Sequence, residues 1–508
     1  MNIVNILAQN AVRHPEKMAV VYEDRSYTYG EFNETVNRFA NGLLDLGVNK
    51  GEKVALMMKN SDFFAISYYA CAKIGAVIVP MNFRLVEREA NYILNQSDSV
   101  LVICDQDYEE LIQASKNGIP AIRQVITVEK PIIEGNLSIE AIFSEDTSEP
   151  PIEINGTDAL HILYTSGTTG NPKGALFDHQ RVTSVNVGMI GTFGYNAQDK
   201  FIHIAPLFHA AQLVICLTSS FFVGGFNVIH REFNPAAIFR DIEKYKITNF
   251  FAVPTMYKLM LEYTDKDQYD VSSINRFSYG AAPMSADLVN QCIKFFKTRN
   301  FYSLCGLTEG GPTGVFLSPE EHKTKIGSAG KDGLLLTEVR VVAANGLDTK
   351  AGEVGELILK GSTIMKEYYK KPKETASTLR DGWLYTGDLG VKDDEGYISI
   401  IDRSKDMIIS GGENVYSVEV ENVLSAHPQI ADIAIIGTPD SQWGEVVTAV
   451  IVQKTGETID LVELEAYCRK NLSGYKIPRK VLFENELPRN ASGKLMKFQL
   501  RETVKINY

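Results

Sequence analysis

At residues 164–174 the chain reads Tyr164-Thr165-Ser166-Gly167-Thr168-Thr169-Gly170-Asn171-Pro172-Lys173-Gly174, directly after an apolar run at residues 159–163. The run has the length and composition of a buried strand. Glycines let backbone N–H groups approach a ligand closely, and the hydroxyl and lysine side chains donate to phosphate oxygens. The pattern predicts a loop that folds round a polyphosphate, with these binding residues: Thr165, Ser166, Gly167, Thr168, Thr169, Gly170 and Lys173.

The spacing differs from that of the usual P-loop, in which Gly-Lys-Ser/Thr follows four intervening residues. Here Lys173 stands three residues after Gly170 and is followed by Gly174, which offers no hydroxyl to magnesium. The alternative interpretation is a flexible surface linker. Linkers seldom follow a buried strand so directly, so we favour phosphate binding.

Length and composition limit the class of protein. A chain of 508 residues exceeds a single hydrophobic core, so we expect two or more domains. The formal net charge of −12 argues against non-specific binding to nucleic acid, and no cluster of aromatic and basic residues suggests single-strand binding. The six cysteines are scattered without a CxxC pair, which is typical of reduced thiols in a cytoplasmic protein.

The sequence favours a cytoplasmic location without a membrane span. Residues 1–7 lack the basic start and long apolar core of a signal peptide. Residues 210–229 carry no formal charge, but their many polar and small side chains make a poor membrane span. We interpret them as a buried helix that runs into a strand, and leave peripheral membrane contact open.

The order of the elements predicts an α/β fold. Strands are expected at residues 54–58, 77–80 and 100–104, and they alternate with helices such as residues 62–73. Such alternation is typical of parallel units in a doubly wound sheet. From residue 339 to 401 the pattern changes to short strands and Gly-rich turns, which indicates a small β-subdomain.

A charged cluster at Asp402-Arg403-Ser404-Lys405-Asp406 separates this region from a compact α+β unit. We place the domain boundary there. The prediction is a large domain of residues 1–402, built of doubly wound sheets with the β-subdomain, and a small mobile α+β domain of residues 403–508.

Six separated blocks resemble the core motifs of the adenylate-forming (ANL) superfamily, and among its members the acyl-CoA synthetases. The first is the 164–174 loop. The others are Tyr279-Gly280-Ala281-Ala282-Pro283, Gly306-Leu307-Thr308-Glu309, Tyr385-Thr386-Gly387-Asp388, a block running from Asp402-Arg403 through Gly411-Gly412 to Glu421, and Pro488-Arg489-Asn490-Ala491-Ser492-Gly493-Lys494. Any one block is moderately specific, whereas all six in order are very specific.

The resemblance implies a two-step reaction. A carboxylate attacks the α-phosphate of ATP to give an acyl-adenylate and pyrophosphate, and the thiolate of coenzyme A then displaces AMP. In-line attack builds negative charge that cations stabilise, and the resemblance assigns this role to Lys494. It places Glu309 as the Mg²⁺ ligand, since magnesium prefers carboxylate oxygen, and Thr308 at the phosphate. Thr165 and His209 complete the implied catalytic group.

The resemblance also assigns the nucleoside contacts. Asp388 would accept hydrogen bonds from the ribose hydroxyls, and Arg403 would add a second contact. Gly280, Ala281 and Ala282 are small enough to let adenine lie against the backbone.

One position departs from the family pattern. Where the family commonly has an aromatic ring that stacks on adenine, this chain has Cys305. Either adenine binding is weaker here, or Tyr302 or another aromatic residue replaces the missing ring.

The small domain of the family rotates between the two half-reactions. Lys405 stands at the matching hinge position, and Gly411 and Gly412 would leave room for the pantetheine arm of coenzyme A. Without the motif, these two glycines would be interpreted as a plain turn.

The sequence predicts the carboxylic acid substrate less specifically than it predicts the reaction. His209 and the uncharged segment behind it should line an apolar acyl pocket, and Phe208-His209-Ala210-Ala211 lacks the aspartate that amino-acid-activating relatives use. We favour a medium- or long-chain fatty acid and leave an aryl acid open. Transfer of the acyl group to a carrier protein, and a catalytically inactive nucleotide or acyl sensor, are the competing hypotheses. The sequence does not decide between monomer and homodimer.

Overall fold

The computed structural model describes residues 1–165, 171–282, 284–489 and 495–507. Its contacts divide the chain into two compact units. The first comprises Met1–Thr165, Pro172–Val339 and Leu359–Leu384, and the second includes Arg340–Ile358 and Tyr385–Tyr508.

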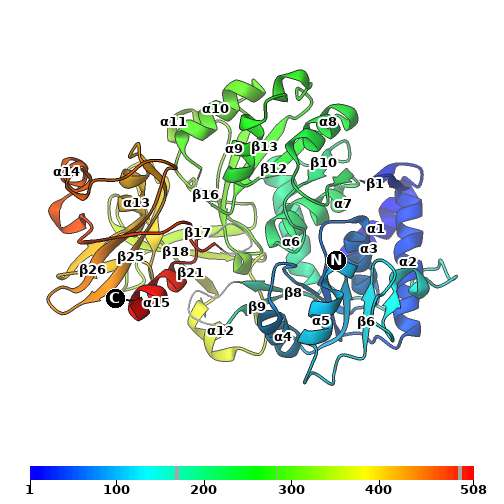
Figure 1. The fold of residues 1–508 in the computed structure, drawn as a ribbon. Helices are drawn as coiled ribbons and strands as arrows, with labels where there is room; N and C mark the ends of the chain where they lie inside the picture. The colour runs from blue at the N-terminus through cyan, green and yellow to red at the C-terminus, as the bar shows by residue number, and fades with distance from the viewer. Residues whose placement is uncertain (166–170, 283, 490–494, 508) are drawn as a thin grey trace. The chain divides into compact units, whose positions relative to one another are not determined.

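A nine-stranded sheet of the first unit carries the second and third sequence blocks (Figure 1). Its order is β16 (Asp332–Gly333), β15 (Gly314–Leu317), β14 (Phe301–Gly306), β13 (Arg276–Gly280), β12 (Asn249–Ala252), β10 (Lys200–His203), β11 (Phe226–Ile229), β1 (Met18–Tyr22) and β2 (Arg25–Thr28). The strands from β14 to β1 are parallel, whereas β15, β16 and β2 pair antiparallel at the two edges.

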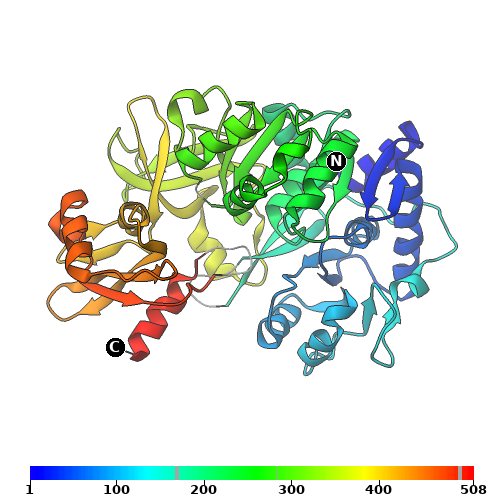
Figure 2. The same cartoon turned by 45° about the horizontal axis from the view of Figure 1, so that its top comes forward.

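Helices cover both faces of this sheet (Figure 2). On one face, Phe250, Phe277 and Phe301 form a buried row across the strands. They pack with side chains of α8 (Pro235–Tyr245), α9 (Pro254–Glu262) and α10 (Ala286–Phe296). The helices α6 (His179–Phe193), η3 (Ala211–Thr218) and α7 (Ser219–Val223) cover the other face.

An eight-stranded sheet of the same unit carries the phosphate-loop stretch. Its order is β19 (Glu367–Tyr368), β9 (Lys173–Asp178), β8 (Ala159–Thr165), β4 (Val77–Pro80), β3 (Lys53–Met57), β5 (Ser99–Cys104), β6 (Gln124–Thr127) and β7 (Leu137–Ser138). The strands from β8 to β7 are parallel, and β9 and β19 are antiparallel. Its helices are α2 (Tyr29–Asp45), α3 (Asp62–Lys73), α4 (Glu87–Gln96) and α5 (Glu109–Ser115).

The predicted α/β class with doubly wound sheets is confirmed, with two differences of detail. The sheets are parallel in their centres and antiparallel at their edges. The expected buried helix after His209 is present, but η3 is π-helical, which sequence periodicity does not distinguish from an α-helix.

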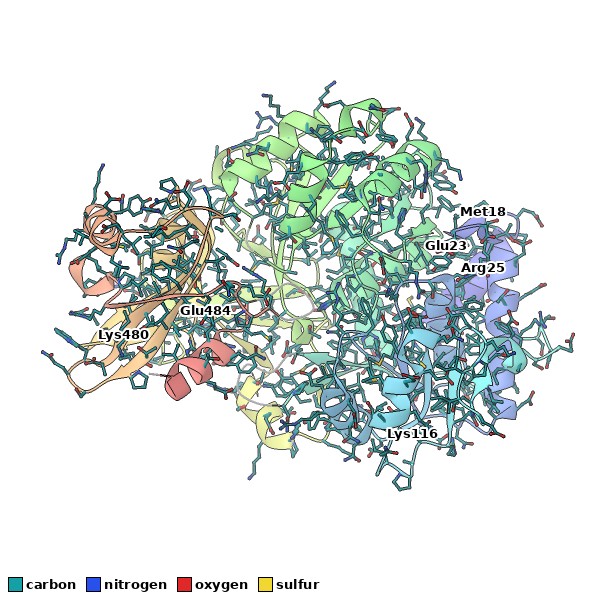
Figure 3. All side chains as sticks on the ribbon, viewed as in Figure 1. Met18, Glu23, Arg25, Lys116, Lys480 and Glu484 are labelled. Atoms are coloured by element: carbon teal, nitrogen blue, oxygen red, sulfur yellow. The ribbon has the colours of Figure 1, made fainter. Side chains whose placement is uncertain are left out.

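Polar contacts fix the N-terminal hairpin of this unit. Met18 begins β1, Glu23 lies in the turn that follows β1, and Arg25 begins β2 (Figure 3). Arg25 donates two hydrogen bonds of 2.6 Å to the buried Asp62 carboxylate at the start of α3. A capping box formed by Thr28 and Glu31 begins α2.

The short strands expected between residues 339 and 401 form a third sheet. Its order is β17 (Thr337–Val342), β18 (Val354–Gly361), β21 (Trp383–Lys392) and β20 (Leu379–Arg380), with β22 (Ile398–Arg403) on β21. Helix α12 (Pro372–Thr378) precedes β20.

The rest of the second unit is a sheet between helices. Its order is β24 (Glu413–Val415), β23 (Ile408–Ser410), β26 (Gly444–Gln453) and β25 (Ile430–Asp440), with β27 (Lys480–Phe483) on β26. Side chains of α13 (Ser417–Ser425) and α14 (Leu461–Asn471) fill one core, and those of α15 (Lys497–Asn507) fill another. Lys480 begins β27, and Glu484 follows its last residue (Figure 3).

The remaining helices are short or peripheral: α1 (Ile3–Arg13), α11 (His322–Lys325), η1 (Gln106–Tyr108), η2 (Ile139–Ile142), η4 (Lys266–Gln268), η5 (Thr308–Gly310) and η6 (Gly474–Lys476). Among the helices that the structure describes, none combines the length and the apolar character needed to cross a lipid bilayer. All cysteines except Cys305 are buried, as expected for small core residues.

Candidate functional site

The predicted phosphate loop is the connection of an antiparallel hairpin. Strand β8 ends at Thr165, and β9 begins at its cross-strand partner Lys173. The Thr165 hydroxyl donates to the Lys173 carbonyl at 3.4 Å, which closes the base of the loop. Five of its predicted donors, Ser166, Gly167, Thr168, Thr169 and Gly170, lie outside the described residues. The hairpin therefore fixes the two ends of the predicted loop.

Tyr368 joins this hairpin to the third sequence block. The Lys173 ammonium lies 4.4 Å from the centroid of the Tyr368 ring, a cation–π contact. The Tyr368 hydroxyl donates to Glu309 Oε1 at 2.6 Å. One buried ring thus contacts both the predicted phosphate-binding lysine and the predicted magnesium ligand.

Backbone pairing places Tyr368 at this point. Tyr368 pairs with Ala175 where β19 adds to β9, and the Met365 N–H donates to the Glu309 carbonyl at 2.8 Å. Sequence reasoning missed Tyr368 because β19 has only two residues and pairs with a strand almost 200 residues earlier. No local pattern in the sequence marks it.

The second and third blocks follow adjacent parallel strands, β13 and β14, so both leave the same edge of the sheet. Gly280 ends β13, and a Cβ there would lie 2.6 Å from the Leu304 carbonyl oxygen. Ala281 adopts a positive φ of 64°, which is uncommon for a residue with a side chain. Thr308 begins η5 directly after β14. Ala282 is exposed, and Pro283 lies outside the described residues.

Tyr302 and Cys305 lie on opposite faces of β14. Side chains alternate along a strand, so residues 302 and 305 of β14 point to opposite faces of the sheet. Tyr302 packs on Phe193 with ring centroids 4.3 Å apart. Tyr302 therefore lies on the face of the sheet opposite to Cys305, packed against Phe193.

In the second unit, Asp388 and Arg403 face each other on β21 and β22. Arg403 Nε lies 2.5 Å from Asp388 Oδ1, an ion pair with both groups at least two-thirds buried. The Asp388 N–H donates to the Thr386 hydroxyl at 3.0 Å. The pairing brings together the two residues predicted to hold the ribose.

The predicted hinge residue, Lys405, lies in a turn between β22 and β23. The N–H groups of Asp406 and Met407 both donate to the Arg403 carbonyl. Just before the turn, the buried Asp402 carboxylate accepts from the Ser417 N–H at 2.5 Å and the Ser417 hydroxyl at 3.1 Å. Hydrogen bonds therefore fix the residues on both sides of Lys405.

A buried lysine completes this network. Lys497 donates to Ser417 Oγ at 2.6 Å and lies 2.7 Å from a carboxylate oxygen of Glu421. Burial raises the pKa of both Asp402 and Glu421, and the Lys497 charge opposes that rise. Two carboxylates therefore share one ammonium group inside this unit.

The Gly411-Gly412 pair forms the two-residue turn between β23 and β24. Their φ values are 60° and 87°, as a turn that matches the strand twist requires. A Cβ at Gly411 would lie 2.6 Å from the Trp443 ring, whereas one at Gly412 would meet no atom within 4 Å. Both glycines suit the turn, and only Gly412 faces open space.

Lys494 lies outside the described residues, but the segments on either side of it are described. Arg489 and Leu495 form an antiparallel bridge, and the Met496 N–H donates to the Pro488 carbonyl at 2.8 Å. Arg489 also binds the Asp432 carboxylate at 2.7 and 2.9 Å. The two ends of the C-terminal motif are therefore held together.

His209 lies at the start of the uncharged segment, two residues before η3. Burial, aided by the Arg84 charge, lowers the pKa of His209 to about 4, so the imidazole is neutral at neutral pH. Its ring lies 4.7 Å from that of Phe208. Among the described residues, no group hydrogen-bonds to the buried Nε2 atom. That nitrogen can bind a polar atom of a ligand.

The comparisons with known proteins agree with this arrangement. A family model described as AMP-binding enzyme matches residues 7–369, and one described as AMP-binding enzyme C-terminal domain matches residues 419–494. The chain belongs to the AMP-binding enzyme family, which confirms the resemblance to adenylate-forming enzymes. Within that family it is an ATP-dependent, AMP-forming acyl-CoA ligase, as the relatives below indicate.

The relatives differ in the acid that their names specify. A feruloyl-CoA synthase of Amycolatopsis is 36% identical over 96% of each chain. The long-chain-fatty-acid–CoA ligase FadD13 of Mycobacterium tuberculosis is 36% identical over 99% of this chain and 98% of its own. The o-succinylbenzoate CoA synthetase of Bacillus subtilis, solved with its acyl-adenylate, has a TM-score of 0.88 at 32% identity over 98% of each chain.

Proposed function

We propose that the chain binds Mg²⁺–ATP at the β8–β9 hairpin and joins coenzyme A to a carboxylic acid whose tail is uncharged and largely apolar. The contact of Tyr368 with both Lys173 and Glu309 supports this most directly. The Tyr368 ring contacts the predicted phosphate-binding cation, and its hydroxyl donates to the predicted magnesium ligand. In this proposal the hairpin grips the phosphates that leave as pyrophosphate.

The donor set fits magnesium. Mg²⁺ takes one or two carboxylates together with substrate phosphates and water, so the single Glu309 carboxylate is enough. Within the described part of the chain, no group of three or more His, Cys, Asp or Glu side chains could hold a metal without such a substrate. When bound, the ion would neutralise charge on the phosphate oxygens.

The other predicted residues have separate tasks in the proposal. Asp388 accepts from the ribose hydroxyls, and the ion pair with Arg403 orients its carboxylate. Lys494 stabilises charge at the α-phosphate during adenylation. Rotation about Lys405 then removes Lys494 and brings Gly411 and Gly412 to the thioester-forming position.

Two classes of acid remain in the proposal. The segment behind His209 is buried and uncharged through η3, which suits an aliphatic or an aryl group. The relatives include ligases named for long-chain fatty acids and for ferulate.

A panel of acids tests the proposal with two readouts, pyrophosphate release and thioester formation. We expect both from at least one fatty or aryl acid, and Lys494→Ala should abolish pyrophosphate release while largely sparing thioester formation from supplied acyl-adenylate. Pyrophosphate without thioester would favour the carrier-protein alternative. Equal loss of both half-reactions in Lys494→Ala would contradict the hinge mechanism.

A further inference from the structure

Two residues of the phosphate-loop stretch, Tyr164 and Gly174, have no part in the proposed chemistry, and they form a cross-strand pair at the base of the loop. A Cβ at Gly174 would lie 2.5 Å from a methyl carbon of Ile162 and 3.0 Å from Cζ of the Tyr164 ring. The Tyr164 ring therefore lies against Gly174, and a side chain at position 174 would displace it. Glycine at this position thus makes room for the tyrosine ring.

The Tyr164 side chain ends at helix α4. Its hydroxyl donates to Oε1 of Gln96, the last residue of α4. The nitrogen of the same amide, Gln96 Nε2, donates to the Tyr369 carbonyl at 2.8 Å, and the Tyr369 N–H donates to the Gly174 carbonyl at 2.8 Å. One side chain of α4 is thus bonded to the end of β8 and to the residue that follows β19.

The same face of α4 reaches the other end of the loop. Tyr92 precedes Gln96 by four residues, so the two side chains are neighbours on the helix surface. The Tyr92 hydroxyl donates to the Pro172 carbonyl at 3.2 Å, directly before Lys173. Helix α4 is therefore bonded to the loop at its start, through Tyr164, and at its end, through Pro172.

Helix α4 is itself fixed on the eight-stranded sheet. Its buried side shares a hydrophobic core with the two strands of the hairpin, and these residues belong to it: Ala90, Ile93, Leu94, Ile162 and Leu176. The shared core sets the positions of Tyr92 and Gln96 relative to the hairpin. Groups that must meet a ligand precisely depend on such a supporting layer of packed and hydrogen-bonded residues.

We propose that α4 is the support that holds the phosphate loop in its ligand-binding form, with Tyr92 and Gln96 as positioning residues for the β- and γ-phosphates of ATP. This inference rests on the proposed function, in which the hairpin grips the phosphates that leave as pyrophosphate. Each of the two side chains acts through a residue that directly precedes a phosphate-binding residue. The support therefore strengthens the binding of a nucleoside triphosphate and leaves the binding of a monophosphate unchanged.

The test is isothermal calorimetry of Mg²⁺–ATP and of AMP with the same protein. AMP lacks the two phosphates that the loop would hold, so its affinity reports the other nucleotide contacts. Gln96→Leu removes both hydrogen bonds of the amide and leaves the Tyr164 hydroxyl without its acceptor. We expect the Kd for Mg²⁺–ATP to rise about tenfold and the Kd for AMP to stay within about twofold of wild type.

Two tyrosine variants examine the two ends of the loop separately. Tyr164→Phe and Tyr92→Phe each remove one hydroxyl and keep the ring, so each should raise the Kd for Mg²⁺–ATP about threefold or more. Because Tyr164 and Gln96 bond to each other, their effects should not add. A protein that carries both Tyr164→Phe and Gln96→Leu should bind Mg²⁺–ATP no more weakly than Gln96→Leu alone.

Asn91→Ala is the matched control on the same helix. Asn91 Nδ2 donates to the carbonyls of Ser115 at 2.6 Å and Asn117 at 3.2 Å, at the end of α5 and beyond it. The substitution removes hydrogen bonds of α4 that do not lead to the hairpin. It should lower the melting temperature without changing the ratio of the Kd values for Mg²⁺–ATP and AMP.

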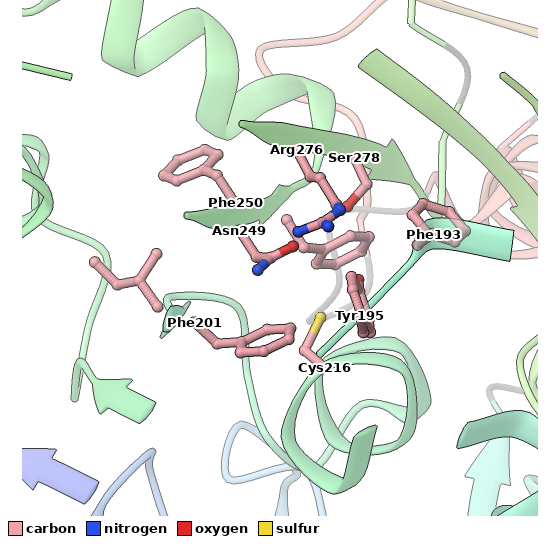
Figure 4. Close-up of a pocket in the computed structure, with 10 residues that line it drawn as sticks. Phe193, Tyr195, Phe201, Cys216, Asn249, Phe250, Arg276 and Ser278 are labelled. Atoms are coloured by element: carbon pink, nitrogen blue, oxygen red, sulfur yellow. The ribbon is translucent and has the colours of Figure 1, made fainter. Parts of the chain in front are cut away.

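Asn249→Leu is a second control, at the small cavity between the nine-stranded sheet and the helices α6 and η3 (Figure 4). It also replaces an amide by leucine, but Asn249 lies in β12, whereas the hairpin belongs to the eight-stranded sheet. The affinities for Mg²⁺–ATP and AMP should both stay at the wild-type level. Loss of an amide in the first unit is then not enough to weaken ATP binding.

If Gln96→Leu has the same ratio of Kd values for Mg²⁺–ATP and AMP as wild type, the inference is overturned, whether both affinities fall or neither does. The proposed function would be unaffected, because the acid panel tests it separately. A wild type that binds Mg²⁺–ATP but releases no pyrophosphate with any acid would reject the proposed function, and the calorimetric comparison would still decide the role of α4.

Discussion

Tyr368 donates its hydroxyl to Glu309 while its ring faces the Lys173 ammonium, so one side chain orients two groups at the candidate nucleotide site. We regard Tyr368 as a positioning residue. It would touch neither phosphate nor metal itself, but it limits the rotamers of both neighbours. A hydrogen bond to a carboxylate is among the stronger ones in proteins.

Tyr368→Phe removes the hydrogen bond and keeps the ring under Lys173. Because a hydrogen bond to a charged group contributes about 1.5–3 kcal/mol, we expect the affinity for Mg²⁺–ATP to fall about tenfold or more. Isothermal calorimetry measures that affinity directly, and the Mg²⁺ dependence of pyrophosphate release gives a second readout. Tyr368→Leu should be weaker still, since it also removes the ring.

Tyr369→Phe is the control for this substitution. The Tyr369 hydroxyl also donates to a carboxylate, that of Asp98 at 2.8 Å, but it contacts neither Lys173 nor Glu309. We expect unchanged binding of Mg²⁺–ATP. If Tyr368→Phe binds Mg²⁺–ATP as tightly as wild type, Glu309 does not depend on this contact.

At the scale of elements, the two glycines in the turn of the β23–β24 hairpin have different roles. The sequence alone does not distinguish them. Both glycines of its turn have positive φ, but only Gly411 packs against a neighbour, the Trp443 ring. The requirement for glycine at position 411 is thus structural. At position 412 the space is open, and a side chain would meet only an incoming ligand.

Gly412→Asn should therefore affect one half-reaction. Asparagine tolerates positive φ, so the turn should survive, and pyrophosphate release should stay near the wild-type rate. Thioester formation from supplied acyl-adenylate should fall about tenfold or more, because the side chain displaces the thiol from its line of attack. Gly411→Ala should instead destabilise the whole hairpin. Equal thioester rates in wild type and Gly412→Asn would mean that this turn does not face coenzyme A.

The sequence predicts local elements better than the contacts between distant ones. The predicted helix at residues 62–73 and strand at 77–80 have the observed bounds, because N-caps, apolar periodicity and turn residues are local signals. The π-helical form of η3 and the position of Tyr368 have no local signal. Both depend on packing against segments far away in the chain, and the site roles of residues such as Lys494 came from motif order alone.

At the scale of the whole molecule, three further histidines of the first unit are buried and neutral, as His209 is. Burial lowers the pKa of His161 to about 3, and those of His179 and His203 to about 4. His203 uses both ring nitrogens as a neutral imidazole, with Asn227 and Gln212 as partners at 2.8 and 2.7 Å. None of the three takes up a proton readily while the unit is folded.

This burial makes the unit sensitive to mild acid. Below the unfolded pKa of about 6.5 the unfolded chain binds protons that the folded chain does not, so stability is complete above that pH and is lost as pH falls toward 4. Between pH 7 and pH 5.5 the three groups together should lower the free energy of unfolding by about 4 kcal/mol. Urea titrations at the two pH values measure this difference.

Single substitutions measure how much each histidine contributes to the pH dependence of the free energy of unfolding. His161→Phe should reduce the pH dependence by about 1 kcal/mol, whereas His14→Gln, at an exposed position, serves as the control. A pH dependence that is the same in His161→Phe and wild type would show that other groups cause it.

The buried network round Lys497 also bears on how the polypeptide is made. Lys497 bonds to Ser417, 80 residues earlier, and Arg501 to Asp406, 95 residues earlier. On a ribosome, the carboxylates of Asp402 and Glu421 therefore emerge long before the cations that neutralise them. Domains generally fold from the N-terminus as they are synthesised. This last unit must wait for its own final helix, so a nascent chain that stalls before residue 497 would carry a finished first unit and an unfinished second one.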